Sequence, residues 1–349
     1  MNEILDARSS GETERRVFQT DQNPNLFKPF TIRSVTSRNH IMVSPMCQYS
    51  GKDGFVTNWH FVHLGARAIG GAGIVCTEVI HTESRGRITP GCLGLWNDEQ
   101  RDRLAPIVEF ISDQGAIPAA QIGHAGRKGS ISRPWEGSIP LESDKGAWST
   151  ISSSPNAFSE GWHTPEELSL GGIDEVMESF KNAARRARQA GFKIIELHGA
   201  HGYLINQFYS HLTNTRADDY GGSFQNRCRF LFDVIEAVRS EWPDKFPLFL
   251  RVSATDWIEG GWGISETIRL AKLLREKGQV DLIDCSSGGT NPNQQVPAHP
   301  GYQVSLSRQI REGASIMTGA VGLIHSPYHA ESILANGEAD LVIMGRTLL

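Results

Sequence analysis

The chain has 349 residues, of which 39% are hydrophobic and 21% are charged, and 34 basic against 39 acidic side chains give a formal net charge of −5. This composition is that of an ordinary globular protein, and it excludes a collagen-like chain, a disordered chain and a polybasic nucleic-acid-binding surface. The length fits two domains of about 150 residues or one large barrel of repeated βα units. The apolar stretch at residues 68–77 is too short to span a membrane, so no membrane partner is expected.

The cysteines indicate the cellular compartment, and the first residues indicate where the folded domain begins. The five cysteines are widely spaced, contain no C-x-x-C pair and follow no secretory signal, which favours a reducing, cytoplasmic compartment. Residues 1–25 are polar and lack apolar periodicity, so we expect a flexible arm there. The folded domain is then expected over residues 26–349.

In chain order, the first expected element is a short hairpin at residues 26–41 that plugs the bottom of a barrel. Short apolar runs bounded by Gly, Pro or Asn then recur, and a stretch of helical periodicity follows most of them. Such alternation is typical of repeated βα units on a parallel sheet. Eight strands are expected, at residues 41–45, 73–78, 117–121, 193–197, 248–252, 282–285, 315–318 and 341–344.

Three helices between these strands have clear sequence signals. Asp174 is expected to cap a helix that ends at Gly191, and Ser223 and Ser265 are expected to begin two more. Eight strands alternating with helices predict a single α/β domain with the (β/α)8 architecture of a TIM barrel. The competing fold, a doubly wound open sheet that binds a nucleotide, would have a glycine loop after its first strand, and none is present.

Two further features concern the rim and the end of this barrel. Residues 130–172 form a long insertion after the third strand, rich in Ser, Pro, Gly and Trp, and we expect it to cover the mouth as a lid. The chain stops soon after the eighth strand, so a final helix and tail are expected to be absent.

Polar residues cluster where the expected strands end, which is where a (β/α)8 barrel carries its active site. Strand three is followed by Gln121 and Lys128, strand four by His198, His201 and Tyr203, while Arg251 lies on strand five. Glycines follow the sixth, seventh and eighth strands, and such loops commonly bind phosphate through backbone amides. The glycines and the arginine considered for a phosphate site are Gly288, Gly322, Gly345 and Arg346.

Several of these segments together resemble the old yellow enzyme family of FMN-dependent ene-reductases. They are Ser44-Pro45-Met46-Cys47, Gln121 with His124-Ala-Gly-Arg127-Lys128, His198-Gly-Ala-His201-Gly-Tyr203, Asn214-Thr-Arg216 with Tyr220-Gly-Gly-Ser223, and Gly345-Arg346. The resemblance runs from about residue 26 to the end of the chain. Cys47 combined with the His-x-x-His pair is similar to the thermophilic-like branch.

The resemblance implies a cofactor, a set of site residues and a reaction. Ser44, Pro45, Met46 and Cys47 would lie against an FMN ring, Gln121 and Arg251 would contact its polar edge, and the late glycines with Arg346 would hold its phosphate. His198 and His201 would bind the substrate oxygen, Tyr203 would donate a proton, and Tyr49 and Lys128 would line the pocket. The implied enzyme is an NADPH dehydrogenase that takes hydride from NADPH or NADH. It would reduce the C=C bond of α,β-unsaturated carbonyl or nitro compounds by a ping-pong mechanism, as a homo-oligomer (a dimer or a tetramer).

Other functions stay open at this point. The histidine pair could bind zinc, but a third ligand at recognisable spacing is missing, so no metal is expected. A flavin-free phosphate-binding barrel could act as a lyase or isomerase through Lys128 and His201. A larger relative that acts on dienoyl thioesters or amines would require a cysteine cluster after the barrel to hold an iron–sulfur centre.

Overall fold

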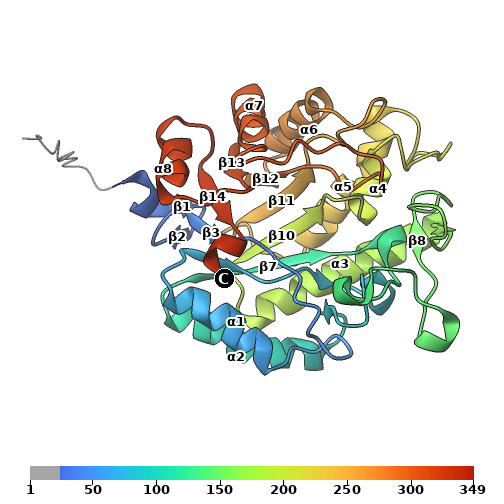
Figure 1. Cartoon of the computed structure of the whole chain (residues 1–349), viewed down its shortest axis with the longest axis horizontal. Helices are drawn as coiled ribbons and strands as arrows, with labels where there is room; N and C mark the ends of the chain where they lie inside the picture. Colours follow the sequence, from blue (N-terminus) through green and yellow to red (C-terminus); the bar gives the residue numbers. More distant parts are fainter. Residues whose placement is uncertain (1–23) are drawn as a thin grey trace, which may run out of the picture.

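The computed structural model describes residues 24–349, and its centre is a closed barrel of eight parallel strands (Figure 1). Each strand pairs in parallel with the next, and the pairings of β10 with β7 and of β14 with β3 complete the ring. The predicted (β/α)8 TIM-barrel architecture and its eight strands are therefore confirmed. The strands are β3 (Ile41–Val43), β4 (Ile74–Cys76), β7 (Ile117–Gly123), β10 (Ile194–Gly199), β11 (Leu248–Ser253), β12 (Leu282–Ser286), β13 (Met317–Ala320) and β14 (Leu341–Met344).

Helices surround this barrel on its outside (Figure 1). A helix follows each strand from β3 to β13, and α4 is an additional short helix after β10. Strand β14 is followed by a 3-10 turn, Arg346–Leu348. The helices are α1 (Asn58–Ile69), α2 (Asp98–Asp113), α3 (Leu170–Ala190), α4 (Leu204–Tyr209), α5 (Phe224–Arg239), α6 (Ile264–Lys277), α7 (Val304–Ala314) and α8 (Pro327–Ala335).

The starts of two helices differ from the sequence expectation. Helix α3 begins after Ser169, whose side chain accepts a hydrogen bond from the Gly172 backbone N–H, so the prediction of Asp174 as its cap is wrong. A serine one turn earlier already satisfies a free N–H group of the first turn, and the helix starts there. Helix α6 likewise begins after Gly263, which places Ser265 inside its first turn. Ser223 caps α5 as expected.

A two-stranded hairpin precedes the barrel. Strands β1 (Phe30–Ile32) and β2 (Val35–Ser37) pair antiparallel. Phe30 and Ile32 are buried in one cluster with residues that begin the barrel strands, such as Ile74, Ile194 and Leu282. The hairpin therefore covers the N-terminal end of the barrel, opposite the end that carries the polar residues.

The insertion between β7 and α3 lies at the other end. It contains the short strands β8 (Ile151–Ser152) and β9 (Glu166–Glu167), and its Ile131 and Trp162 pack in one cluster with Tyr49 and Tyr203. Strands β5 (Ile80–His81) and β6 (Leu93–Gly94) extend the sheet beside β7. The insertion thus reaches the residues that the sequence places at the barrel mouth.

The expected arm at residues 1–25 lies outside the described residues except for its last two. Of these, Asn25 is docked on the barrel, because its backbone N–H donates to Glu331 Oε1 at 3.0 Å. Within residues 24–349, no helix is long and apolar enough to cross a membrane.

Candidate active site

Polar side chains from neighbouring strands meet at the C-terminal end of the barrel. Arg251 on β11 donates from Nη2 to Ser44 Oγ, just past β3, at 3.2 Å. His198 on β10 is the register partner of Arg251, and Gln121 on β7 is that of Glu196. Residues far apart in the sequence thus lie on one end of the barrel, as their positions at strand ends predict.

His198 and His201 face each other. His198 Nδ1 accepts the Ala200 backbone N–H at 3.2 Å, so its proton sits on Nε2, which lies 3.2 Å from His201 Nδ1. His201 Nε2 lies 2.7 Å from Ser286 Oγ at the end of β12. Burial, followed by the charge of Arg251, lowers the pKa of His201 to about 3, and burial with His201 nearby lowers that of His198 far below its usual range. Both rings are neutral at physiological pH.

The backbone of His201 is held in an uncommon conformation. Its φ is +59°, in the left-handed region that non-glycine residues rarely adopt. Two contacts hold it there: its N–H donates to Ser253 Oγ at 2.8 Å, and Lys128 Nζ donates to its carbonyl oxygen at 3.0 Å. Lys128 Nζ also donates to the Gly289 carbonyl at 2.8 Å, which joins the two loops. Lys128 is therefore a clamp on the histidine loop. Burial, with Arg127 as a second cause, lowers the pKa of Lys128 to about 7.

Tyr203, Tyr49 and Cys47 pack together beside the histidines. All three contact one apolar cluster, and the Tyr203 ring lies edge-on to His198 with centroids 4.8 Å apart. Burial raises the pKa of both tyrosines well above its usual value. Burial and the nearby Glu78 also raise the pKa of the Cys47 thiol. All three groups keep their protons at neutral pH.

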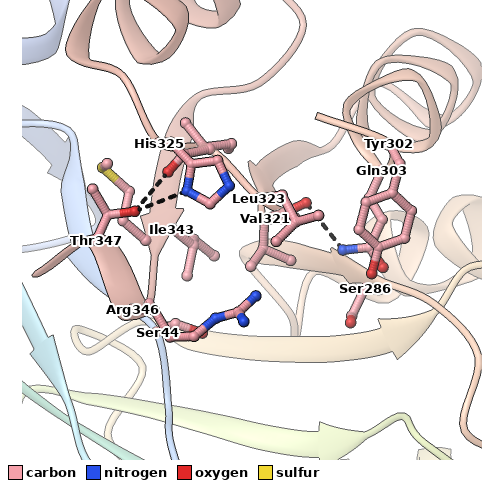
Figure 2. A pocket seen from close by; sticks show the side chains of 14 residues that line it. Ser44, Ser286, Tyr302, Gln303, Val321, Leu323, His325, Ile343, Arg346 and Thr347 are labelled. Atoms are coloured by element: carbon pink, nitrogen blue, oxygen red, sulfur yellow. Dashed lines mark hydrogen bonds between the residues drawn. The ribbon is translucent and has the colours of Figure 1, made fainter. Parts of the chain in front are cut away.

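A cavity of about 220 Å³ lies between the loops that follow β13 and β14, and Ser44 and Ser286 are part of its wall. Figure 2 shows the Arg346 side chain extending into it, and none of the 14 residues that line it is acidic. Gly322 has a φ of +123°, and a Cβ there would meet Gln303 Nε2 at 2.9 Å, so the bare backbone is needed at this wall. A cavity with an arginine, two glycines and no carboxylate fits a phosphate group.

The structure does not bring every candidate to this cavity. Gly322, Gly345, Arg346 and Ser44 line it, whereas Gly288 does not. The Gly288 carbonyl accepts the Ser253 hydroxyl at 2.7 Å, so Gly288 belongs to the loop beside His201.

Three contributors were missed by the sequence analysis: Ser286, Tyr302 and Gln303 line the cavity. Buried Gln303 donates to the Val321 carbonyl at 3.0 Å (Figure 2). Ser286 could have been found, because it ends a predicted strand. Tyr302 and Gln303 follow a long loop, so no strand-end signal marks them.

Comparison with known proteins agrees with this geometry. Residues 25–349 match the NADH:flavin oxidoreductase / NADH oxidase family. The chain belongs to this family. It is 46% identical over 326 residues to an NADPH dehydrogenase of Geobacillus sp. (strain WCH70), covering 93% of this chain and 90% of the relative. It is 45% identical over 329 residues to an NADPH dehydrogenase of Bacillus cytotoxicus, covering 94% and 90%.

Solved structures of similar fold include two reductases and an old yellow enzyme homologue. A 2-naphthoyl-CoA reductase complex superposes with a TM-score of 0.84 at 28% identity, covering 92% of this chain, which spans 50% of the length of that reductase. Morphinone reductase gives a TM-score of 0.78 at 24% identity, with coverages of 94% and 87%. An old yellow enzyme homologue from Zymomonas mobilis gives 0.76 at 24%, with coverages of 93% and 89%. These last two support the fold.

The family establishes the class of activity. The protein is an FMN-dependent NAD(P)H oxidoreductase of the old yellow enzyme type, with FMN as its cofactor and a nicotinamide as co-substrate. The flavin-free lyase or isomerase considered from the sequence is therefore wrong. The cavity lined by Arg346 and the polar strand ends carry groups that could hold FMN.

Proposed function

We propose that this enzyme reduces the C=C bond of α,β-unsaturated carbonyl or nitro compounds at the site formed by His198, His201 and Tyr203. The observation that carries the proposal is the pair of histidine nitrogens 3.2 Å apart. With a substrate oxygen between them, the two neutral rings can each offer an N–H to that oxygen, which becomes negative during the reaction. When bound, FMN supplies the hydride chemistry.

Both histidines can donate to the same substrate oxygen. His198 already carries its proton on Nε2. His201 presents an N–H at Nδ1 when the Ser286 hydroxyl, 2.7 Å from its Nε2, turns to donate to that nitrogen. The substrate oxygen then takes the place of the contact between the two rings. One such positioned donor typically contributes about 10²-fold or more to the rate.

Tyr203 is proposed as the proton donor to the substrate α-carbon. Its ring lies against His198 on the side of Cys47 and Tyr49, and burial keeps its hydroxyl protonated at neutral pH. A general acid has to hold its proton until the substrate needs it.

The remaining roles complete the proposal. Pro45, Met46 and Cys47 lie against the flavin ring, Gln121 and Arg251 contact its polar edge, and Gly322, Gly345 and Arg346 hold its phosphate, with Gly288 supporting the loop nearby. Tyr49 lines the pocket, and Lys128 lines it while holding His201. The nicotinamide and the alkene use the same pocket in turn, which gives ping-pong kinetics. The five cysteines are all free, which supports the proposed cytoplasmic location. We also propose a homo-oligomer, whose mass light scattering would measure.

The histidine assignment is tested with His198→Ala and His201→Ala in the FMN-loaded protein. Titration with a phenol, which places its oxygen where a substrate oxygen binds, is followed by its charge-transfer absorbance with the flavin. We expect at least a tenfold weaker phenol complex in each variant, and no change in His211→Ala, a control on the outer surface. Affinities equal to the wild type in both variants would contradict the assignment.

A further inference from the structure

Four buried polar residues on adjacent strands form a layer at the barrel mouth that the mechanism above uses only in part. Gln121 on β7 pairs in register with Glu196 on β10, and Arg251 on β11 pairs with Asp284 on β12. Glu196 and Asp284 are completely inaccessible to solvent, and Arg251 is 5% exposed. The two carboxyl groups have no part in binding or protonating the alkene.

Their contacts are short and incomplete. Arg251 Nε lies 2.6 Å from Asp284 Oδ2 and 3.9 Å from Glu196 Oε1, and Gln121 Nε2 donates to Glu196 Oε1 at 2.8 Å. The second oxygens, Glu196 Oε2 and Asp284 Oδ1, find no donor among residues 24–349. The two carboxyl groups therefore flank the same Arg251 nitrogen. An ionised carboxylate oxygen that is buried without a donor is costly, which favours a proton on one of the two groups.

The charges lead to the same conclusion. One guanidinium faces two carboxyl groups, so full ionisation would leave a net negative charge in the barrel interior, which is costly. The other titratable groups around the pair add no positive charge. Burial raises the pKa of the Cys76 and Cys285 thiols far above the usual value. The lowered pKa values of His198 and His201, which lie near Arg251, keep both rings neutral. Burial raises the pKa of both Glu196 and Asp284, and the charge of Asp284 is a second cause that helps to bring the pKa of Glu196 to about 8.

We propose that Glu196 and Asp284 share one proton, and that this proton sets the charge beside the flavin edge that Gln121 and Arg251 contact. The inference rests on the proposed placement of that edge. With the proton in place, the cluster is neutral. Without it, a negative charge lies beside the ring and opposes the addition of electrons. The carboxyl pair therefore holds the shared proton more tightly when the flavin is reduced than when it is oxidised.

The proton balance of reduction follows from this difference. Hydride from the nicotinamide carries two electrons and one proton to the flavin. Between the pH at which the oxidised protein loses the shared proton and the higher pH at which the reduced protein loses it, each reduction also takes one proton from solvent onto the carboxyl pair, and reoxidation returns it. The equilibrium constant for flavin reduction then falls by a further tenfold per pH unit. This corresponds to a further decrease of about 30 mV per pH unit in the potential of a two-electron couple. Glu196 and Asp284 are positioning residues, since they act on the flavin through Gln121 and Arg251.

The test uses Glu196→Gln and Asp284→Asn in the FMN-loaded protein. Each variant leaves one carboxylate opposite Arg251, so both have the net charge of the protonated wild type. We expect FMN potentials close to the wild type at neutral pH, and a steeper pH dependence at alkaline pH in the wild type alone. A steeper slope that persists in both variants, or is absent from the wild type, overturns the proposal.

Infrared spectroscopy provides a second readout that does not depend on turnover, and its wild-type titration requires no variant. The wild type should show a protonated carboxyl stretch at neutral pH that disappears on alkaline titration, and Glu196→Gln should lack it. If Glu196→Gln differs from the wild type only by the loss of an ionised carboxylate signal, the two groups do not share a proton. Because neither measurement requires an alkene, a protein that fails to reduce alkenes can still pass, which separates this inference from the proposed reaction.

Discussion

Tyr203 is the residue whose proposed role separates most cleanly from its neighbours. Tyr203→Phe keeps the ring against His198 and removes the hydroxyl. We expect flavin reduction by NADPH to be nearly unchanged, while reoxidation by an enone slows about 10²-fold, the lower range for a lost general acid. Reoxidation by a nitroalkene should slow less, because its nitronate can be protonated in water. Stopped-flow absorbance of the flavin measures both half-reactions.

Tyr49→Phe is the matched control, because Tyr49 lies in the same cluster and its pKa is raised in the same direction. It should leave enone reoxidation within a few-fold of the wild type. If Tyr203→Phe slows reoxidation equally with the enone and with the nitroalkene, Tyr203 does not donate the proton. The same conclusion follows if Tyr49→Phe slows reoxidation by the enone as much as Tyr203→Phe does.

For single residues, the sequence predicted which side chains reach the site more reliably than it predicted their roles there. His198 and His201 are visible because they follow an apolar run, and Arg251 because it is a charged residue within one. The clamp by Lys128 was not visible, since it depends on carbonyl oxygens of two loops and on the positive φ of His201. Glu196 and Asp284 lie within strand-forming runs, where nothing in the local pattern distinguishes a shared proton from an ordinary ion pair.

Among the elements, the N-terminal hairpin makes a contribution to stability that can be measured apart from catalysis. Phe30→Ala removes a 6%-exposed ring from the cluster at the barrel bottom. We expect the free energy of unfolding to fall by about 3–5 kcal/mol, the usual range for a buried phenylalanine, while FMN binding stays intact. Chemical denaturation measures the change. Phe27→Ala, at a side chain that is 57% exposed, is the control and should cost far less.

The loop after β7 is anchored by a carboxylate whose effect depends on pH. Burial alone would raise the pKa of Glu83, but hydrogen bonds and charges from His124 and Arg85 outweigh it and lower the pKa to about 2. A lowered folded-state pKa stabilises the protein above pH of about 4.5 and loses this effect as the pH falls toward 2. Glu83→Gln should therefore cost about 1–3 kcal/mol at pH 7.

Urea denaturation at pH 7 and pH 3 tests this anchor. The difference in stability between Glu83→Gln and the wild type should shrink at the lower pH. A difference that is equal at both values would show that the charge of Glu83 contributes nothing.

The elements themselves were largely predictable, because strand runs bounded by turn residues define each βα unit. Helix starts were less so: Ser169 and Asp174 are both good caps, and only the hydrogen bond to Gly172 decides between them. The contacts of Trp162 and Ile131 with the tyrosine cluster could not be predicted, because a long insertion without periodicity does not fix where its side chains pack.

For the whole molecule, FMN should couple the loops after β13 and β14 to overall stability. A ligand that binds only the folded protein raises its melting temperature. Arg346→Ala should weaken FMN binding about 10-fold to 100-fold, as expected for a lost charged hydrogen bond, and reduce the rise in melting temperature. Riboflavin, which lacks the phosphate, is the control and should bind both proteins equally. A similar loss for riboflavin would place Arg346 elsewhere on the cofactor.

The measurement that tests the central claim most directly is an anaerobic pair of half-reactions on the wild-type enzyme. NADPH should bleach the FMN absorbance. Addition of one equivalent of a cyclic enone should then restore it and yield one equivalent of the saturated ketone. A flavin that NADPH reduces but that no electron-poor alkene reoxidises in the absence of oxygen would contradict the account.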